Sequence, residues 1–407
     1  MLLEKGGQTF IKFSSHVDNF IFKCNLLVMI KSYVWLALSM TISFASFGQK
    51  KFEVVLSFPG MLTLTDMRIQ IDNGLGRTTV PYTIADNNQV MLSDFYYSRY
   101  AAVVISLPKS ENSVHHNFFF VDEKHARITF LPPVKDSSPL DQYVLTNAYD
   151  FRSERDKMET FAAAETAEVK KYFEKHEKEI FDGNHKDLQD QFFEMDRKIY
   201  LKDIEYIKKT GNSYFSFWYF RSNAHYSGLP VDSILSIFDN IFPVSFKKST
   251  EGHAYRQLLV GKLETKKGNA AAQFSARDIN GNAVALSSFK NKKYVMLDFW
   301  ATWCVPCIKA MPFLSDLREK YSEQLEIISI AYPTNISLVK DQIAKQKMIW
   351  TNIYNDISLI NSYGGMGAIP KLILIDKSGK IVYDNQKDND ADLTILVNLL
   401  EQNLVAK

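Results

Sequence analysis

The most informative segment of this chain reads Trp300-Ala301-Thr302-Trp303-Cys304-Val305-Pro306-Cys307. It directly follows Lys293–Phe299, a mostly apolar run of the kind that forms a strand buried on both faces of a sheet. A helix is expected from Cys304 to Tyr321. The two cysteines therefore lie where a buried strand passes into a helix, which predicts a mixed α/β domain with its chemistry at that junction.

The position of each cysteine in this junction predicts its role. Unpaired N–H groups and the helix dipole place partial positive charge at a helix N-terminus, which favours the thiolate form of Cys304. Cys307 lies one turn further on, within reach of the Cys304 sulfur. Pro306 fits the first turn, where a missing N–H costs little. We therefore expect Cys304 to attack a disulfide and Cys307 to resolve the mixed disulfide.

The cysteine pair has two other interpretations. It is half of many zinc sites, but the chain has no second such pair and no histidine beyond His253. It could also be an inert structural disulfide, although the flanking Trp300 and Trp303 suit exposure and substrate contact better. We expect a redox-active disulfide, Cys304–Cys307, that requires no metal and no other cofactor.

The flanking segments extend the α/β pattern. Asn280-Gly281 is a hairpin signal between two short β runs. The predicted strands are Phe274–Ile279, Ala283–Leu286, Leu325–Ala331, Lys371–Ile375 and Lys380–Tyr383, and the predicted helices are Ser337–Lys345 and Ala391–Leu404. The last two strands are expected to pair antiparallel across Ser378-Gly379.

These motifs resemble a known family. Leu297-Asp298-Phe299-Trp300-Ala301 before W-C-x-P-C is similar to thioredoxin. Residues 270–407 resemble the TlpA-like (ResA-like) branch, the thioredoxins of the bacterial envelope, in the hairpin before the first core strand and in the insert around Tyr332–Tyr363. The resemblance covers about a third of the chain. It implies a thioredoxin-like α/β fold for residues 268–407 and thiol–disulfide oxidoreductase activity.

The resemblance also implies roles for single residues. Pro370 in Ile369-Pro370 matches the family's cis-proline, which packs against the redox pair and holds an extended substrate backbone. Asp298 matches the buried acid that moves a proton to or from the resolving thiol. An ordinary trans proline and a strand-end acid are the alternatives. The expected substrate-contact residues are Trp303, Val305, Pro306 and Ile369.

Two positions depart from the family pattern. Many ResA-like proteins carry a glutamate three residues after the second cysteine, where this chain has Ala310. Val305 stands where glycine is usual. Because both changes lie beside the cysteines, the motif does not fix whether the pair acts as a reductant or as an oxidant.

The preceding residues divide into a β-rich and a helical part. Short runs rich in β-branched and aromatic residues between Lys51 and Leu131, among them Thr78–Ile84, predict an antiparallel, sandwich-like domain over residues 49–140. Residues 141–267 form the predicted helical region, with an aromatic run at Tyr214–Phe220 as core, and 268–407 the redox domain. The predicted helices are Thr160–Phe181, Lys186–Lys209, one after Pro230 through Ile241, and Arg256–Lys266, with Lys266–Asn269 as a linker. Residues 50–265 resemble, more loosely, the β-rich domain and helical spacer of one TlpA-like subgroup.

The first 48 residues are interpreted as a targeting segment. Val34–Phe44 is apolar but too short to span a bilayer, and Ser46-Phe47-Gly48 offers small residues to a signal peptidase. Cleavage would leave Gln49 first and remove Cys24, so that only the redox pair remains. Met29 is an alternative start, and an uncleaved membrane anchor is the alternative fate. The expected location is the periplasm or cell envelope.

Charge is balanced along the chain, with 48 Lys+Arg against 46 Asp+Glu. No concentrated basic face is visible, so the composition excludes a typical nucleic-acid binder. We expect a thiol–disulfide oxidoreductase that reduces or isomerises disulfides of envelope proteins and is recharged by an unidentified membrane electron donor. The alternatives are a disulfide oxidant, and an envelope partner-binding protein with an accessory redox module.

Overall fold

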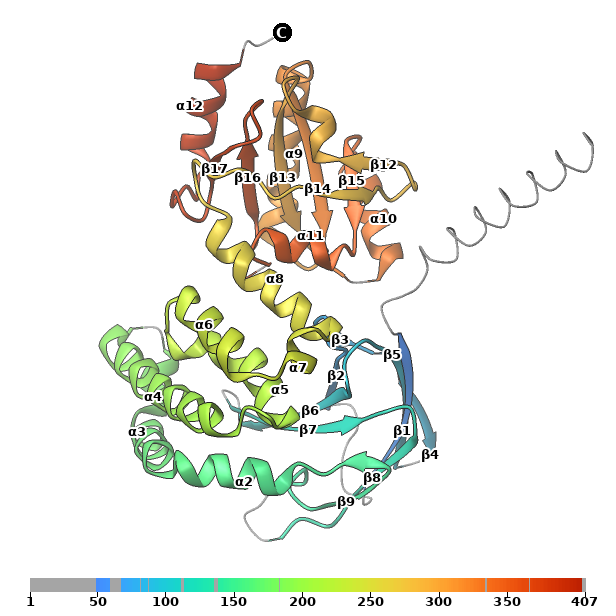
Figure 1. The fold of residues 1–407 in the computed structure, drawn as a ribbon, viewed down its shortest axis with the longest axis vertical. Helices are drawn as coiled ribbons and strands as arrows, with labels where there is room; N and C mark the ends of the chain where they lie inside the picture. Colours follow the sequence, from blue (N-terminus) through green and yellow to red (C-terminus); the bar gives the residue numbers. More distant parts are fainter. Residues whose placement is uncertain are drawn as a thin grey trace, which may run out of the picture. The chain divides into compact units, whose positions relative to one another are not determined.

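The structure is a computed structural model that describes residues 49–58, 67–80, 82–86, 88–110, 113–134, 138–182, 184–333, 335–365 and 367–404. The expected targeting segment, its cleavage site after Gly48 and Cys24 lie outside these residues. The predicted architecture is confirmed, with a β-rich part, a helical middle and an α/β C-terminal part following one another along the chain (Figure 1). Among the described residues, no helix is long and apolar enough to span a membrane.

Residues 50–149 contribute two sheets that share one core. Their strands are β1 (Lys50–Ser57), β2 (Arg68–Asp72), β3 (Arg77–Thr79), β4 (Thr83–Asp86), β5 (Gln89–Tyr96), β6 (Ala101–Ser110), β7 (Ser113–Val121), β8 (His125–Phe130), β9 (Tyr143–Thr146) and β10 (Ala148–Tyr149). One sheet has the order β4-β5-β1-β8-β9 and the other β10-β7-β6-β2-β3. Alternate side chains of β1, such as Val54 and Leu56, are buried in the shared core, as the two-residue period of a strand requires.

Three details of this sandwich differ from the sequence prediction. The expected single strand Thr78–Ile84 is wrong, because β3 and β4 are separate strands in different sheets. The sandwich is not purely antiparallel, since β1 and β8 run parallel. Strands β9 and β10 lie beyond the predicted boundary at residue 140. A run of residues that supplies strands to two different sheets is β-rich throughout, so composition alone does not reveal the break between the strands.

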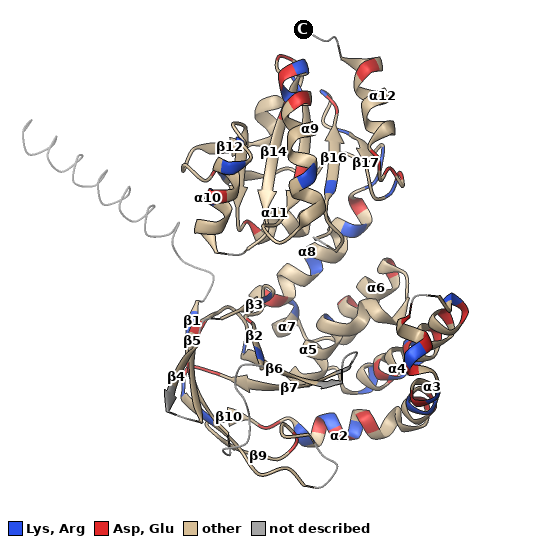
Figure 2. Cartoon of the chain, turned by 180° about the vertical axis from the view of Figure 1, so that it is seen from behind, with Lys and Arg blue, Asp and Glu red and all other residues tan. Residues whose placement is uncertain are grey.

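The helical middle packs an aromatic helix against the second sheet. The helices are α2 (Arg152–Phe161), α3 (Ala163–Phe181), α4 (Lys186–Thr210), α5 (Tyr214–Asn223), α6 (Val231–Ile241), α7 (Val244–Lys247) and α8 (Thr250–Glu264). The expectation that the Tyr214–Phe220 run forms core is confirmed, because α5 is buried along most of its length and shares a cluster with Phe120 of β7. Charged residues of both signs lie along α2, α3 and α4 (Figure 2).

Two helix starts were misplaced by the sequence prediction. The helix expected from Thr160 begins at Arg152 and is split at Ala162 into α2 and α3. The helix expected from Arg256 begins at Thr250, because the side chain of Ser249 caps it by accepting the Gly252 N–H.

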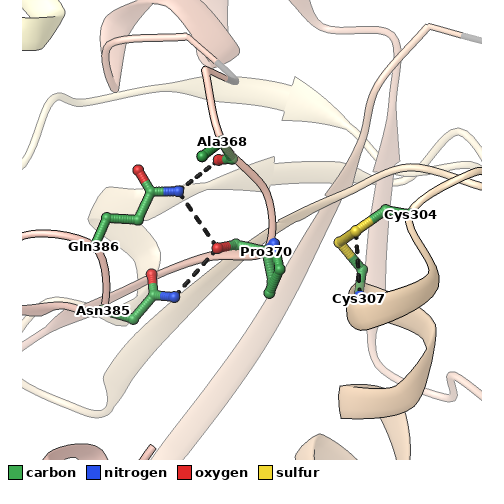
Figure 3. The surroundings of a disulfide bond; sticks show 6 residues. All are labelled: Cys304, Cys307, Ala368, Pro370, Asn385 and Gln386. Atoms are coloured by element: carbon green, nitrogen blue, oxygen red, sulfur yellow. Dashed lines mark hydrogen bonds between the residues drawn. A yellow bond between two sulfur atoms is a disulfide. The ribbon is translucent and has the colours of Figure 1, made fainter. Parts of the chain in front are cut away.

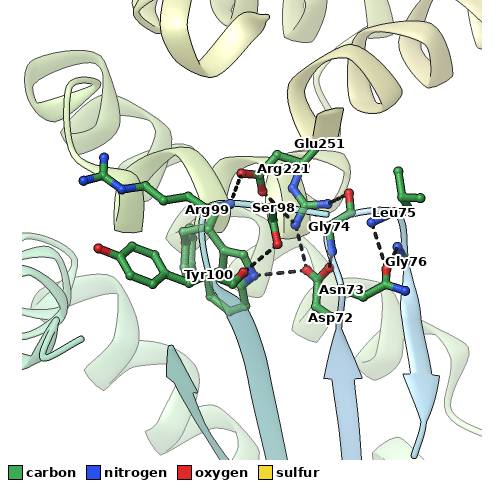
Figure 4. A network of polar contacts seen from close by, with 12 residues as sticks. Asp72, Asn73, Gly74, Leu75, Gly76, Ser98, Arg99, Tyr100, Arg221 and Glu251 are labelled. Atoms are coloured by element: carbon green, nitrogen blue, oxygen red, sulfur yellow. Dashed lines mark hydrogen bonds and ion pairs between the residues drawn. The ribbon is translucent and has the colours of Figure 1, made fainter. Parts of the chain in front are cut away.

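A buried ionic network joins the β-rich part to the helices (Figure 4). Arg221 of α5 donates to Asp72 Oδ2 at 2.8 Å and lies 3.6 Å from Glu251 Oε2 of α8. Trp218 Nε1 donates to Asp72 at 3.1 Å, and Tyr214 Oη donates to Glu251 at 3.1 Å. Asp72 and Glu251 are only 4% and 1% exposed. A buried carboxylate is stable when it has both an opposite charge and hydrogen bonds, and each of these two has both.

The C-terminal part is built on one mixed sheet with the order β15-β14-β13-β16-β17. Its elements are β11 (Ser275–Arg277), β12 (Ala283–Ala285), β13 (Tyr294–Trp300), α9 (Val305–Tyr321), β14 (Leu325–Ala331), α10 (Ile336–Lys345), β15 (Thr351–Tyr354), α11 (Ile357–Ser362), β16 (Lys371–Ile375), β17 (Ile381–Asp384) and α12 (Thr394–Asn403). The central strand β13 is parallel to β14 and antiparallel to β16. One face packs against α9 and α12, and the other against α11 and β12. The predicted thioredoxin-like fold of this part is confirmed, and β15 and α11 are the elements that the sequence prediction missed.

Helix α8 contacts the C-terminal part very closely. A Cβ atom at Gly261 would lie 2.1 Å from the carbonyl oxygen of Asn361, so only glycine fits this crossing with α11. Asn361 Nδ2 also donates to the Ala254 carbonyl at 3.2 Å. The predicted linker is hydrogen-bonded as well, from Gly268 N to Ile381 O at 2.8 Å. The boundary at residue 268 stays a prediction, although both cores of the C-terminal part are formed from residues 271–404.

Candidate active site

The two cysteines form a disulfide where the central strand passes into helix α9. Their Cα atoms are 5.3 Å apart and both side chains are almost fully buried. Cys304 is the N-cap residue of α9, and its sulfur accepts the Cys307 backbone N–H at 3.2 Å. This contact is the one expected to stabilise a Cys304 thiolate, because an otherwise unpaired N–H group points at the sulfur.

The residues around the disulfide differ sharply in exposure. Trp303 and Val305 are 65% and 58% exposed, which is unusual for large apolar side chains. Pro306 lies in the first turn of α9 and is also exposed. Ile369 is half-buried and packs against the cluster that contains both cysteines. The structure therefore brings the four expected substrate-contact residues around one sulfur pair, and their contact with substrate stays a prediction.

The pairing of β13 with β16 places Pro370 close to the segment that carries the two cysteines. Because Phe299 pairs with Lys371, the residues that follow β13 and precede β16 are neighbours. The Ile369–Pro370 peptide bond is cis, as the resemblance implied. The Pro370 carbonyl accepts from Asn385 Nδ2 at 3.2 Å and Gln386 Nε2 at 3.4 Å (Figure 3).

Gln386 holds this segment at a second point, since its Nε2 also donates to the Ala368 carbonyl (Figure 3). The sequence prediction missed Asn385 and Gln386. Both follow β17 in a polar turn, and nothing in their composition indicates that the turn reaches the proline segment.

Asp298 lies inside β13 and is 2% exposed, so the alternative of a strand-end acid is wrong. Its Oδ2 accepts a hydrogen bond from Ser329 Oγ at 2.7 Å, and Ser329 Oγ accepts one from Trp350 Nε1 at 2.8 Å. Burial raises the pKa of Asp298 to about 7, and the Ser329 hydrogen bond only partly opposes this. The carboxyl group can therefore gain or lose a proton near neutral pH.

The orientation of Asp298 follows from the alternation of side chains along β13. Met296 and Trp300 belong to the same cluster as the two cysteines, and Asp298 lies between them on that face. No hydrogen bond to either cysteine is recorded for Asp298 in the part of the chain that the structure describes. The sequence offered one signal for its partner, because Ser329 is the polar residue in the otherwise apolar centre of β14.

A second buried ionisable group lies on the opposite face of the sheet. Lys371 follows the cis-proline, is 7% exposed, and donates from Nζ to the Tyr363 carbonyl. Burial lowers the pKa of Lys371 to about 8. Within the described ranges, no group of three or more histidine, cysteine, aspartate or glutamate side chains could hold a metal ion.

Comparison with known proteins gives consistent matches to this region. The family model described as Redoxin matches residues 266–400. The thiol-disulfide oxidoreductase ResA of Bacillus thuringiensis (strain Al Hakam) is 34% identical over 130 residues, which cover 31% of this chain and 74% of that protein. The thioredoxin-like protein YneN of Bacillus subtilis (strain 168) is 28% identical over 139 residues, 32% of this chain and 78% of that protein.

Solved structures match the same part of the chain. The thioredoxin domain of a thiol-disulfide oxidoreductase from Bacteroides vulgatus is 27% identical, with a TM-score of 0.29 over 33% of this chain and 97% of that chain. A protein described as a putative protein disulfide isomerase from Bacteroides thetaiotaomicron is 28% identical, with a TM-score of 0.31 over 34% of this chain and 90% of that chain.

Proposed function

Because the chain belongs to the ResA-like thiol–disulfide oxidoreductases of the thioredoxin family, we propose that it reduces or isomerises disulfides of envelope proteins through Cys304 and Cys307. The observation that carries this proposal is the Cys304 sulfur at the N-cap of α9. The exposed Trp303 and Val305 beside it offer an apolar surface to a protein substrate.

The reaction transfers two electrons in two thiol–disulfide exchanges. In the dithiol form, the Cys304 thiolate attacks one sulfur of the substrate disulfide, a mixed disulfide forms, and one substrate thiolate leaves. The Cys307 thiolate then attacks the Cys304 sulfur, which releases the second substrate thiolate and closes the Cys304–Cys307 disulfide. The disulfide in the structure is this oxidised end point. A dithiol donor must then reduce it, and we assign that step to an unidentified electron donor in the membrane.

Two further residues support the exchange. Cys307 must lose its proton before it attacks, and Asp298, with a pKa raised to about 7, is the proposed acceptor. The Ile369–Pro370 segment is the proposed site for an extended substrate backbone. The Pro370 carbonyl already accepts hydrogen bonds from Asn385 and Gln386. We therefore assign the backbone contacts with substrate to Ile369.

The proposed location is the periplasm or cell envelope, with an uncleaved N-terminal anchor as the alternative. The short apolar segment Val34–Phe44 and the small residues that follow it support export. Beyond the proposed cleavage site after Gly48, the sequence has two cysteines, which are the redox pair. A protein with one reactive pair and no structural disulfides is suited to exchange with other proteins.

The proposal is tested by trapping the mixed disulfide. Cys307→Ser keeps the attacking sulfur but removes the resolving one, so this variant should carry covalently bound partner proteins when it is isolated from the host envelope under acid quench. Cys304→Ser is the matched control and should trap none. Insulin reduction by the wild type, and its loss in both variants, is the expected companion result. Trapping by Cys304→Ser alone would reverse the assigned roles.

A further inference from the structure

A cavity of about 480 Å³ lies in the N-terminal half of the molecule, between β7 and the helices α2, α4 and α5. Its wall includes apolar side chains, among them Met158, Phe118 and Phe215. Polar side chains from three of the helices also reach it, including Glu159 of α2, Asp203 of α4 and Tyr219 of α5. A concave, partly apolar site with a few convergent polar groups is the usual form of a small-ligand site.

Asp203 is the unusual member of this wall. It is 4% exposed, and its Oδ2 accepts a hydrogen bond from Tyr219 Oη at 2.6 Å. Burial raises the pKa of Asp203 to about 6, with Glu159 and Asp196 adding same-sign repulsion and the Tyr219 hydrogen bond opposing it. Within the described residues no lysine, arginine or histidine forms an ion pair with this carboxylate.

Two of the other acids that line the cavity have a basic side chain beside them. His115 Nε2 lies 3.0 Å from Asp141 Oδ1. Arg155 Nε lies 3.6 Å from Glu159 Oε1. Among the described residues, the buried carboxylate of Asp203 is therefore the acid of the cavity wall that has no basic side chain within ion-pair distance. Burying an unpaired carboxylate is costly, so a cation that enters this cavity regains part of that cost.

We propose that this cavity binds an organic ammonium group, with Asp203 as its counter-ion and with the alkyl part of the ligand against Met158, Phe118 and Phe215. The aromatic rings favour a cation as well as an alkyl chain. One carboxylate with a phenol is a poor ligand set for a divalent metal, and the described residues contain no group of three metal-ligating side chains. The proposal does not depend on the redox function, because no residue of the C-terminal part lines the cavity.

The binding should depend on pH, because it requires ionised Asp203. The charged and titratable groups around it come from every packed element and are Arg155 and Glu159 of α2, Asp196 of α4, Tyr219 of α5, His115 and His116 of β7, and Asp141. Burial lowers the pKa of His116, which keeps that side chain neutral at pH 7. With Asp203 titrating near pH 6, affinity should fall about tenfold between pH 7 and pH 5.

Calorimetric titration of the full chain with alkylammonium chlorides tests the proposal. At pH 7, affinity should rise from methylammonium to butylammonium by about fourfold per buried methylene. Asp203→Asn should weaken butylammonium binding at least tenfold, whereas the control Asp190→Asn, an exposed acid on the same helix, should leave it unchanged. Tyr219→Phe keeps the carboxylate but removes its hydrogen bond, so the pH at which binding is half lost should move upward.

A second probe distinguishes the sources of the ammonium group. If Nα-acetyl-lysine N-methylamide binds as well as butylammonium, the cavity accepts a lysine side chain from a protein; if it fails while butylammonium binds, the ligand is a free amine. Absence of binding for every amine, or equal binding by wild type and a folded Asp203→Asn variant, would overturn the proposal. Circular dichroism of each variant separates lost binding from lost folding.

Discussion

Two regions of this molecule bury carboxylates in opposite ways. Around Arg221, the carboxylates of Asp72 and Glu251 pair with the same guanidinium, so negative charge is matched by a nearby positive charge. In the C-terminal half, Asp298 is buried with the hydroxyl of Ser329 as its hydrogen-bond partner, and its pKa is raised to about 7. A buried ion pair can hold two elements of the fold together. A buried carboxylate without a cation lowers stability, and it is the kind of group that performs proton transfer.

The largest expected effect comes from breaking the matched charges. Arg221→Met leaves two buried carboxylates without their cation, which should lower the free energy of unfolding by about 3–5 kcal/mol. Urea unfolding followed by circular dichroism measures this loss. Arg152→Met is the matched control, because its ion pair with Asp150 is largely exposed and should contribute less than about 1 kcal/mol. Equal losses in both variants would refute the structural role of the network.

Removing the unmatched carboxylate of Asp298 should stabilise the folded protein instead of destabilising it. Above an unfolded-state pKa near 3.9, unfolded Asp298 is ionised, whereas the folded protein keeps the proton up to about pH 7. Wild-type stability should therefore fall as the pH rises from about 4 to about 7. Asp298→Asn should abolish this fall and gain roughly 2–4 kcal/mol at pH 8, with little difference near pH 4.

The same Asp298→Asn variant should be a poorer enzyme where it is more stable. At pH 8 its insulin reduction should be about tenfold slower, because the proton acceptor for Cys307 is lost. Paired unfolding and turnover measurements at pH 6 and pH 8 supply the check, with all proteins compared in the same redox state. A variant that is destabilised at pH 8, or that turns over normally there, would contradict this function for Asp298.

A smaller effect is expected from the hydroxyl partner. The Ser329 hydrogen bond favours ionised Asp298, so Ser329→Ala should raise the pKa of Asp298 further. The pH profile of turnover should move toward alkaline pH by about one unit. Trp350→Phe, which removes the donor to Ser329 and not the bond to Asp298, should move it less. An unchanged pH profile in Ser329→Ala would show that the protonation of Asp298 does not control the rate of turnover.

The redox domain was largely predictable because its signals are local. The limits of β14 were predicted to the residue, since a mostly apolar run starts after the polar Glu323-Gln324 and stops shortly before Pro333. The insert after Tyr332 was only partly resolved, because β15 and α11 are each too short to show a clear period. Cys304, Cys307, Asp298 and Pro370 were found through one motif and one resemblance, and their roles stay predictions.

What the sequence could not supply are contacts between distant segments. Arg221 meets Asp72 across 149 positions, and nothing near either residue indicates the other. Asp203 looks like one of many acids on a charged helix, and its burial depends on β7 and three other helices. The segments that hold Pro370 and cap α8 likewise depend on polar residues in turns, where composition carries little information.

The central claim is that Cys304 is the attacking thiolate because it lies at the N-cap of α9, whereas Cys307 lies inside the first turns of the helix. Rates of alkylation by iodoacetamide, measured on the fully reduced protein at pH 7 with peptide mapping of each cysteine, test this most directly. The account predicts that Cys304 is alkylated first and that Cys307 reacts much more slowly. Faster alkylation of Cys307 would contradict it.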